Sequence, residues 1–319
     1  MRFEFATTTH IIFGPGTIRD FAPLAAEMGK RAFIVTGESL ERAEPLLKNL
    51  NKLEIECTTF GVTGEPTTIM AKTGIEQARR AKSDLVIGIG GGSALDTGKV
   101  IAAMLTNNGE LEDYLEVVGR GKPLTQSPVP YIAIPTTAGT GAEVTQNAVL
   151  SVPEHQVKVS LRGPFVSARL AVVDPVLTHS MPPSITACTG LDALTQLMEA
   201  YVSNKANPLT DGICREGLKR AGRSLLQAYE DGNNSSARED MALASLFSGL
   251  ALANAKLGAV HGFAGPLGGM ISAPHGTICA RLLPYVMEAN VQALQNRAPD
   301  SPALARYGEI AQMVNGNKA

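Results

Sequence analysis

The sequence predicts an α/β domain followed by an all-helical domain, because the residue pattern changes near the middle of the chain. In the first half, short β-branched segments alternate with stretches of helical spacing, which is typical of βαβ units around a parallel sheet. In the second half, long segments rich in alanine and leucine follow one another without strand signals between them. Three prolines within residues 174–183 discourage regular structure there. We therefore expect an α/β domain over residues 1–178 and a helical domain over residues 179–319.

The expected elements follow from composition and spacing. Short apolar, β-branched segments predict strands at residues 32–35, 55–60, 85–89, 131–134 and 170–173. Apolar residues at helical spacing predict helices at residues 17–28, 39–50, 68–81 and 93–105. The second half has longer helical patterns at residues 185–202, 208–229 and 238–256, and another at residues 303–314. This order predicts a Rossmann-like first domain.

Composition narrows the classes of partner. The chain has 319 residues, 44% of them hydrophobic, which suits two domains with substantial cores. A net charge of -2 and a pI near 6.2 leave no basic excess for nucleic acid or an anionic membrane surface, so we expect a small-molecule partner. No apolar run is long enough to span a bilayer, and the first residues do not form a targeting signal. A cytoplasmic protein is expected.

The four cysteines, Cys57, Cys188, Cys214 and Cys279, stand far apart in the sequence. Their spacing indicates neither a disulfide framework nor a thiolate zinc site. We expect them to be reduced and buried.

A glycine-rich turn is the strongest chemical signal in the first half. The segment GIGGGSALDTGK, residues 88–99, directly follows an expected strand and opens an expected helix. Glycines in such a turn let the backbone approach a phosphate, and the positive end of the following helix favours its charge. Ser93 and Asp96 can cap the helix or accept bonds from a nucleotide. A tight strand-to-helix turn that serves packing alone is the alternative interpretation.

A second loop, IPTTAGTGAEVT at residues 134–145, follows another expected strand. Its hydroxyls and small residues suit close contact with a ribose or an amide. Thr140 and Glu143 also have the spacing of a capping box at a helix start, and the two interpretations are compatible. At the carboxyl edge of a parallel sheet, two such loops would flank a nucleotide crevice.

Candidate metal ligands occur in the second half. Asp192 and Gln196 are four residues apart in a helical pattern and so share a face. His261 and His275 lie among glycines and prolines, where we expect sharp turns that bring both imidazoles to one point. One carboxylate and two imidazoles suit Fe²⁺ or Zn²⁺ and leave coordination positions for a substrate. The alternative is that each histidine separately caps a helix or fills a polar niche.

Several long motifs in this order resemble the iron-containing, or type III, alcohol dehydrogenases, a superfamily that includes glycerol dehydrogenase and resembles dehydroquinate synthase. The resemblance covers essentially the whole chain. Its motifs are FGPGT from Phe13, GGGSALDTGK, PTTAGTGAEVT, VVDP from Val172, MPPSITACTGLDALTQLMEAYVS from Met181 and GAVHGFAGPLGGMISAPHGTICARLLPYVMEAN from Gly258. The resemblance implies a dehydroquinate synthase-like fold.

The resemblance also implies residue roles. Gly91, Gly92, Ser93 and Asp96 would hold the pyrophosphate and nearby groups of NAD or NADP. The rest of the nucleotide cleft would be lined by Thr136, Thr137, Thr140, Thr145 and Lys158. The metal positions map to Asp192, Gln196, His261 and His275, with Fe²⁺ expected from the family and Zn²⁺ as the alternative. The implied activity is a metal-dependent, NAD(P)-linked interconversion of a small alcohol and its aldehyde or ketone, in a homodimer.

Three positions depart from the family pattern. Gln196 replaces a histidine ligand, and a neutral amide oxygen is a poorer ligand for iron. Gly265 stands where many relatives carry a histidine beside the substrate. Gly37 stands where NAD-preferring relatives have an aspartate that binds the ribose hydroxyls, although Glu38 is adjacent, so NAD and NADP both remain open. The second domain is also expected to be short at its C-terminal end, because relatives continue with further helices.

Two other functions compete with a dehydrogenase. A lyase or cyclase resembling dehydroquinate synthase would use the same cofactor and metal, but it needs several basic residues for a phosphate-bearing substrate. Only Lys256 and Arg281 lie near the ligands in the sequence. A non-catalytic nucleotide-binding protein is the other alternative, suggested by Gln196 and Gly265.

Overall fold

The computed structural model describes residues 2–8, 10–271 and 273–316. The chain forms two compact units, each described separately below. The α/β unit comprises Thr7–Thr136 and Ala142–Leu177, and the helical unit comprises Met1–Ala6, Thr137–Gly141 and Thr178–Ala319. The short segment Thr137–Gly141 is thus grouped with the helices, although it follows a strand of the sheet.

A six-stranded parallel sheet forms the centre of the α/β unit, in the order β1-β8-β5-β4-β2-β3. Its strands are β1 (His10–Phe13), β2 (Arg31–Thr36), β3 (Glu56–Gly61), β4 (Leu85–Gly90), β5 (Tyr131–Pro135) and β8 (Leu170–Val173). The expected parallel α/β architecture is confirmed. Strand β1 was not predicted, since it is short and lies at the sheet edge, where no residue of it is fully buried.

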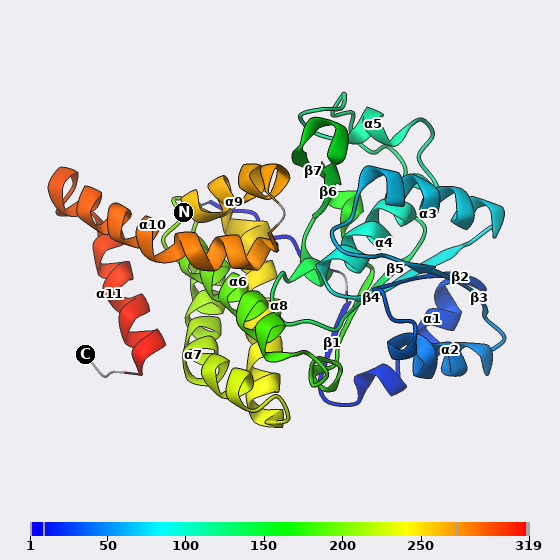
Figure 1. The fold of residues 1–319 in the computed structure, drawn as a ribbon, viewed down its shortest axis with the longest axis horizontal. Coiled ribbons are helices and arrows are strands. Elements are labelled where there is room, and N and C mark those ends of the chain that lie inside the picture. The colour runs from blue at the N-terminus through cyan, green and yellow to red at the C-terminus, as the bar shows by residue number, and fades with distance from the viewer. Residues whose placement is uncertain (1, 9, 272, 317–319) are drawn as a thin grey trace. The chain divides into compact units, whose positions relative to one another are not determined.

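Helices cover both faces of this sheet (Figure 1). The helices α1 (Ala22–Met28) and α2 (Glu44–Asn51) pack on one face, and α3 (Thr68–Arg80) and α4 (Gly92–Met104) pack on the other. Strand β4 is buried along its whole length, with Val86 in one core and Ile87 in the other. Complete burial of an Ile or Val side chain contributes about 1.5–3 kcal/mol, so the middle strands anchor the unit.

Two predicted helices begin later than expected. Each expected segment opens with a separate 3-10 turn, Thr17–Arg19 before α1 and Glu41–Ala43 before α2. Proline stands in the first turn of both α-helices. A proline has no N–H to donate and its ring clashes with a preceding helical turn, so a helix starts at proline more readily than it continues through it.

An antiparallel hairpin, β6 (Asn147–Val152) and β7 (Val157–Arg162), lies outside the main sheet and was not predicted. Its inward-facing residues Leu150, Val159 and Leu161 join the core on the α3 and α4 face. Alternate residues of β6 are buried, which is the two-residue period of a half-buried strand. That period is the signal in the sequence that could have predicted the hairpin. The short helix α5 (Leu111–Tyr114) completes the unit.

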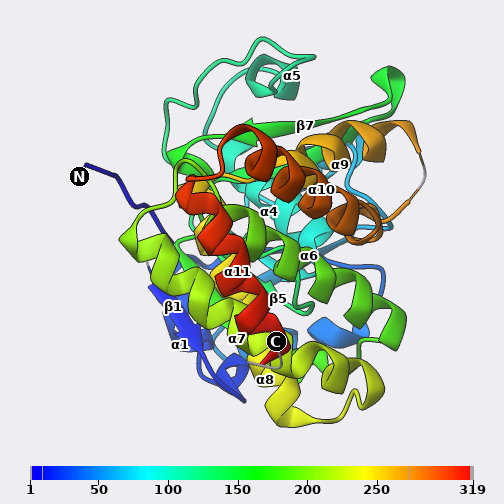
Figure 2. The same ribbon diagram turned by 90° about the vertical axis from the view of Figure 1, so that its left-hand side faces the viewer.

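The helical unit contains α6 (Pro183–Tyr201), α7 (Pro208–Glu230), α8 (Ser235–Ala255), α9 (Ala259–Met270), α10 (His275–Arg297) and α11 (Pro302–Asn315). Helices α6, α7 and α8 share one apolar core, and α11 lies alongside α7 (Figure 2). The predicted helical second domain is confirmed. No single described helix is long and apolar enough to cross a membrane, although α8 and α9, bent by 99°, would meet that test as a pair.

The glycine- and proline-rich segment around the histidines is more regular than predicted. Residues 259–270 form α9 despite four glycines and Pro266, and α10 begins at His275. Glycine costs about 1 kcal/mol in a helix relative to alanine, which the burial of Val260 and Ala264 offsets.

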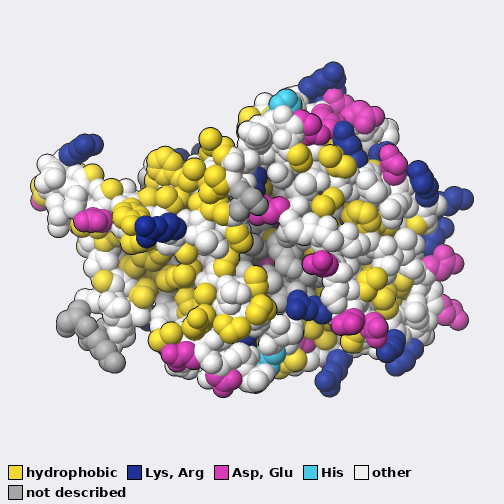
Figure 3. Space-filling model, in the orientation of Figure 1, with side chains coloured by type: hydrophobic (Ala, Val, Ile, Leu, Met, Phe, Trp, Pro, Cys, Tyr) yellow, Lys and Arg dark blue, Asp and Glu magenta, His cyan; other side chains and the backbone are white. Residues whose placement is uncertain are grey.

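Most of the exposed large apolar side chains belong to the helical unit. Figure 3 shows hydrophobic side chains of several types gathered over the helices of this unit on the face that it draws. Leu226, Phe263 and Met270 are each more than half exposed. Among the cysteines, Cys214 and Cys279 are buried as expected, but Cys57 and Cys188 are only partly buried.

Candidate metal and nucleotide sites

One face of α6 carries three buried polar side chains. Asp192, Gln196 and Glu199 follow one another at intervals of four and three residues, so they project from the same side of the helix. Each is only 2% exposed. Buried carboxylates and amides need partners, and these come from α8, α9 and α10.

Four potential metal ligands converge at this face. Asp192 of α6, His261 of α9 and His275 and Cys279 of α10 place one donor atom each within 4.8 Å of all the others. The Oδ1 atom of Asp192 lies 3.3 Å from Nε2 of His261 and 3.8 Å from Nε2 of His275. The predicted ligands Asp192, His261 and His275 are therefore brought together, and Cys279 joins them without having been predicted. The spacing of His275 and Cys279, four residues apart on one helix, is the signal that could have found it.

Glu199 fixes the orientation of His261. Its Oε2 atom lies 2.7 Å from Nδ1 of His261, and its Oε1 atom accepts the backbone N–H of Val260 at 2.7 Å. With Nδ1–H donated to the carboxylate, Nε2 is the ring nitrogen that faces Asp192. A histidine that ligates a metal is held in this manner, by a carboxylate on its other nitrogen. Sequence reasoning missed Glu199, although it continues the spacing of Asp192 and Gln196.

Gln196 presents its amide nitrogen, not its oxygen, to the cluster. The Nε2 group donates to Oδ2 of Asp192 at 3.2 Å, and the Oε1 atom accepts the hydroxyl of Ser248 at 2.9 Å. Gln196 is thus close to the other predicted ligands, but its oxygen is engaged by α8. The two oxygens of Asp192 are divided, with Oδ2 held by Gln196 and Oδ1 facing the histidines.

The electrostatics of the cluster favour positive charge between the carboxylate and the imidazoles. Burial alone would raise the pKa of Asp192, but the His261 hydrogen bond and the two imidazoles lower it overall. Burial alone would lower the pKa of His261, but Asp192, Cys279 and Glu199 raise it well above its ordinary value. A site that stabilises a proton so strongly between its donors has the charge distribution that a divalent cation requires. The donor types, one carboxylate, two imidazoles and a thiol, also fit such an ion.

Gly265 leaves open space beside α9. A Cβ atom built at this residue would meet nothing within 4 Å. No described group therefore fills the space of the histidine that the family resemblance leads us to expect at this position.

In the α/β unit, Gly37 and the glycine-rich turn meet at the carboxyl ends of neighbouring strands. Gly37 follows β2 and Gly91 follows β4, and a Cβ at Gly90 would lie 2.7 Å from Cβ of Ala94 and 3.3 Å from the backbone nitrogen of Gly37. The chain passes from β2 outward to β3 and then returns to the other side of β2 at β4. This reversal is the position where open α/β sheets bind nucleotides.

The N-terminus of α4 is arranged for a phosphate. Gly91 is the N-cap, Gly92 is the first helical residue, and no side chain of the described residues caps the helix. The N–H groups of Gly92 and Ser93 have no partner within the helix, because Leu95, the fourth helical residue, is the first to reach back to the cap, at the carbonyl of Gly91. Together with the helix dipole, they have the features that favour an anion at a helix N-terminus. Thr136 extends the same edge after β5, with its N–H bonded to Gly90 O at 2.9 Å.

Asp96 and Thr145 are already engaged inside the unit. Lys99, which is 1% exposed, donates from Nζ to Oδ1 of Asp96 at 3.2 Å, to Thr145 at 2.8 Å and to the carbonyl of Asn147 at 2.7 Å. The Oδ2 atom of Asp96 accepts the N–H of Val149 at 2.9 Å. These bonds fasten the β6–β7 hairpin to α4. Lys99 was not singled out in the sequence, although it ends the glycine-rich motif.

The remaining predicted nucleotide residues are divided between the two units. Lys158 of β7 is paired with Glu65 at 2.5 Å and its side chain is 7% exposed. Thr137 and Thr140 belong to the segment grouped with the helical unit. In that segment, Cβ atoms at Gly139 and Gly141 would lie 2.5 Å from Cβ of Thr189 and 2.4 Å from Cα of Gly249, so its glycines permit close packing on α6 and α8.

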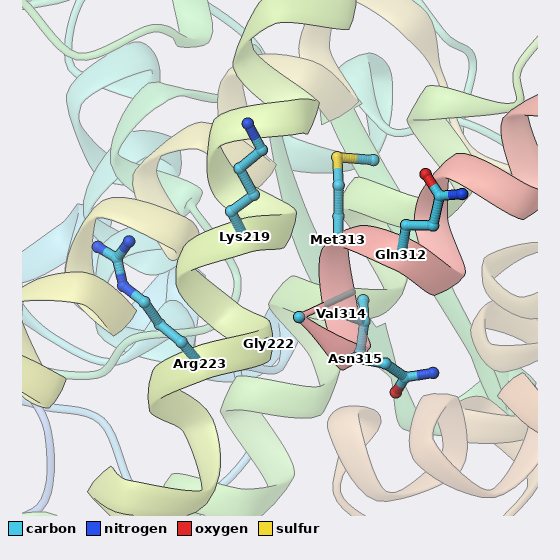
Figure 4. Close-up of a pocket in the computed structure, with 8 residues that line it drawn as sticks. Lys219, Gly222, Arg223, Gln312, Met313, Val314 and Asn315 are labelled. Carbon is cyan, nitrogen blue, oxygen red and sulfur yellow. The ribbon is translucent and has the colours of Figure 1, made fainter. Parts of the chain in front are cut away.

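A separate hollow lies between α7 and α11 and has a volume of about 730 Å³. Figure 4 shows Lys219 and Arg223 projecting from α7, with Gln312, Met313 and Asn315 on α11. None of the described residues that line it belongs to the donor cluster or to the glycine-rich turn. The hollow is therefore not the candidate catalytic site.

Comparison with known proteins identifies relatives over nearly the whole chain. The family model "Iron-containing alcohol dehydrogenase" matches residues 8–175, and the model "Fe-containing alcohol dehydrogenase family, C-terminal" matches residues 186–319. Alcohol dehydrogenase 4 of Saccharomyces cerevisiae is 38% identical over 304 residues, which cover 94% of this chain and 77% of the yeast protein.

Solved structures of other proteins superpose on nearly the whole chain. A 1,3-propanediol oxidoreductase superposes with a TM-score of 0.88 at 32% identity, covering 99% of this chain and 86% of that one. The sulfoacetaldehyde reductase of Bifidobacterium kashiwanohense, solved in complex with NAD+, superposes with a TM-score of 0.84 at 28% identity, covering 98% of this chain and 86% of that one.

Proposed function

The chain belongs to the iron-containing alcohol dehydrogenase family, and we propose on that premise that it is a metal-dependent, NAD(P)-linked oxidoreductase. It interconverts a small alcohol and its aldehyde or ketone. The observation that carries this proposal is the convergence of Asp192, His261 and His275 from three helices on one point. The comparisons favour this activity over the lyase alternative, and the sequence around the ligands lacks the basic cluster that a phosphate-bearing substrate would need.

Asp192, His261 and His275 would hold a divalent metal, Fe²⁺ by family and Zn²⁺ as the alternative. Such an ion acts as a Lewis acid that polarises a carbonyl oxygen and stabilises the alkoxide charge. Glu199 binds Nδ1 of His261, which leaves Nε2 as the nitrogen aimed at the site and makes it a stronger ligand. Gln196 holds Oδ2 of Asp192 and leaves Oδ1 for the ion.

The nucleotide would bind with its pyrophosphate at the N-terminus of α4, against Gly91, Gly92 and Ser93. Its nicotinamide supplies or accepts the hydride. Gly37 has no neighbour within 4 Å of its Cβ position, so it sets no steric barrier to a 2′-phosphate, and either NAD or NADP is compatible with this turn. The relative solved with NAD+ supports NAD. By the family resemblance, the rest of the proposed cleft is lined by Thr136, Thr137, Thr140, Thr145 and Lys158. Asp96 contributes mainly by holding the side chain of Lys99.

A homodimer and a cytoplasmic location are proposed from the family resemblance. Sedimentation equilibrium tests the first, and fractionation of cells that express the full chain tests the second.

The first experiment measures NAD(P)H oxidation with a panel of short aldehydes on chelated protein, and again after anaerobic addition of Fe²⁺ or Zn²⁺. We expect turnover to return with a metal and to be absent in His261→Ala. The matched control is His155→Ala, which removes an exposed histidine from the other unit. Binding of NAD(P)H without turnover under every condition would favour the non-catalytic alternative.

A further inference from the structure

Cys279 occupies the place of a fourth ligand. It follows His275 by one helical turn on α10, and it is fully buried with its thiol turned into the cluster. Its Sγ atom lies 3.6 Å from Nε2 of His275 and 3.8 Å from Nε2 of His261. Nothing in the spacing of the four cysteines along the chain indicated a thiolate ligand.

The distances between donor atoms match the edges of a tetrahedron around one ion. Bonds of about 2.0–2.1 Å to nitrogen and oxygen and 2.3 Å to sulfur imply donor separations of roughly 3.3–3.6 Å at tetrahedral angles. The separations of Asp192 from His261, of Cys279 from His275 and of Cys279 from His261 are 3.3, 3.6 and 3.8 Å. Asp192 Oδ1 also lies 3.8 Å from Nε2 of His275, and all four donor atoms lie within 4.8 Å of one another, so one ion can reach all of them after small adjustments.

Gln196 is not available for that place. Its oxygen accepts the hydroxyl of Ser248, and the nitrogen that it presents to Asp192 carries two protons and has no lone pair for a metal. Its observed contact is with Oδ2 of Asp192, the oxygen turned away from His261. Gln196 is thus a positioning residue for the carboxylate.

Charge balance favours the same assignment. Asp192 and a Cys279 thiolate with two neutral imidazoles carry a charge of two negative units, which neutralises a divalent ion in a buried site. With Gln196 as the fourth ligand, the site would keep a net positive charge. Glu199, one contact further out, directs its charge at the N–H groups of Val260 and His261.

We propose that the thiolate of Cys279 is the fourth protein ligand of the metal, in place of the residue at position 196, and that this makes the site one for Zn²⁺ in preference to Fe²⁺. The inference rests on the proposed function, since it concerns the same metal. On binding, the thiol releases its proton to solvent and the sulfur lone pair forms the bond to the ion. A donor set of a thiolate, two imidazoles and a carboxylate is of the type that Zn²⁺ takes, and the substrate oxygen would bind as a fifth ligand.

The test is spectroscopic and does not depend on turnover. The metal-free full chain is loaded with Co²⁺, and the near-ultraviolet sulfur-to-cobalt charge-transfer band is recorded at a stoichiometry of one. X-ray absorption of the Zn²⁺ form then counts sulfur atoms at about 2.3 Å. We expect the band and one sulfur in the wild type, and loss of both in Cys279→Ser with Zn²⁺ affinity lowered about 10–100-fold. Competition between Zn²⁺ and Fe²⁺ should favour Zn²⁺ in the wild type and less so in Cys279→Ser.

The matched control is Cys214→Ala, which removes an equally buried thiol outside the cluster and should keep the band. Gln196→Ala should also keep the charge-transfer band. If the wild type binds one Co²⁺ with nitrogen and oxygen ligands alone, the proposal is overturned while the metal-dependent function stands. If the wild type binds no metal at all, the thiolate proposal and the proposed metal-dependent function both fail. The spectrum of the wild type by itself shows whether sulfur is a ligand, so the test holds even where a variant fails to fold.

Discussion

Each unit of this protein buries a carboxylate on a helix, and the two carboxylates are neutralised in different ways. Asp96 of α4 is paired with Lys99, a cation three residues away on the same helix. Asp192 of α6 faces His261, His275 and Cys279, which arrive from other helices and are neutral or anionic in their metal-binding forms. The first carboxylate has a permanent counter-ion and serves the fold. The second carboxylate, that of Asp192, needs a counter-ion that can exchange. This difference distinguishes a structural ion pair from a metal site.

Breaking the permanent pair should have the largest effect on stability. In Lys99→Met, the buried Asp96 and Thr145 lose their shared partner, and we expect a loss of about 3–5 kcal/mol in the free energy of unfolding. Urea denaturation measures it. The double variant Lys99→Met with Asp96→Asn should recover part of the loss because the unpaired charge is gone. A Lys99→Met protein as stable as the wild type would show that Asp96 needs no counter-ion.

The stability of the α/β unit should also depend on pH. Glu143 lies near Lys99, and burial raises the pKa of the Glu143 carboxyl to about 7. A raised carboxyl pKa contributes stability that is fully present below its unfolded value, near 4.5, and is lost as the pH rises to about 7. Glu143→Gln should therefore gain stability relative to the wild type across this window, by up to about 3 kcal/mol. Denaturation at a series of pH values measures the difference. Parallel stability profiles would contradict it.

In the donor cluster of the helical unit, Glu199→Gln should lower the affinity for the metal ion more than it lowers the stability of the fold. The amide can still accept the N–H of His261 but lacks the charge that makes the imidazole a stronger ligand. We expect metal affinity to fall about 10–100-fold, as measured by competition with a chromophoric chelator. Glu288→Gln on the exposed side of α10 is the control and should change nothing. An unchanged affinity in Glu199→Gln would mean that His261 is oriented by packing alone.

The smallest expected effect concerns the nucleotide. Gly37→Asp adds a carboxylate where the Cβ position is open, so the fold should tolerate it. The new charge should repel a 2′-phosphate and lower kcat/KM with NADPH about tenfold, or about 1.4 kcal/mol, with little loss for NADH. Steady-state kinetics with both cofactors measure the ratio. An unchanged ratio would show that the ribose does not reach this turn.

The glycine-rich turn illustrates what local sequence can predict. Strand, glycines and helix are contiguous at residues 85–104, so the fold of this segment and its capacity for a phosphate follow from short-range rules. The face of α6 that carries Asp192 and Gln196 was predictable for the same reason. The four-residue spacing of His275 and Cys279 places them on one face of α10, but whether Cys279 meets Asp192 depends on how α10 packs on α6, which local sequence does not determine.

The sequence by itself determined the class of both units, the order of most strands and helices, the phosphate turn, and three of the residues in the donor cluster. Periodicity and glycine placement act over a few residues, which is why these could be recognised. Only the tertiary structure decided that Cys279 and Glu199 join those ligands, that Gln196 turns its oxygen away, and that Asp96 is occupied by Lys99. Those outcomes depend on which buried polar groups find partners on other elements, and burial makes an unpartnered group costly enough to determine the arrangement.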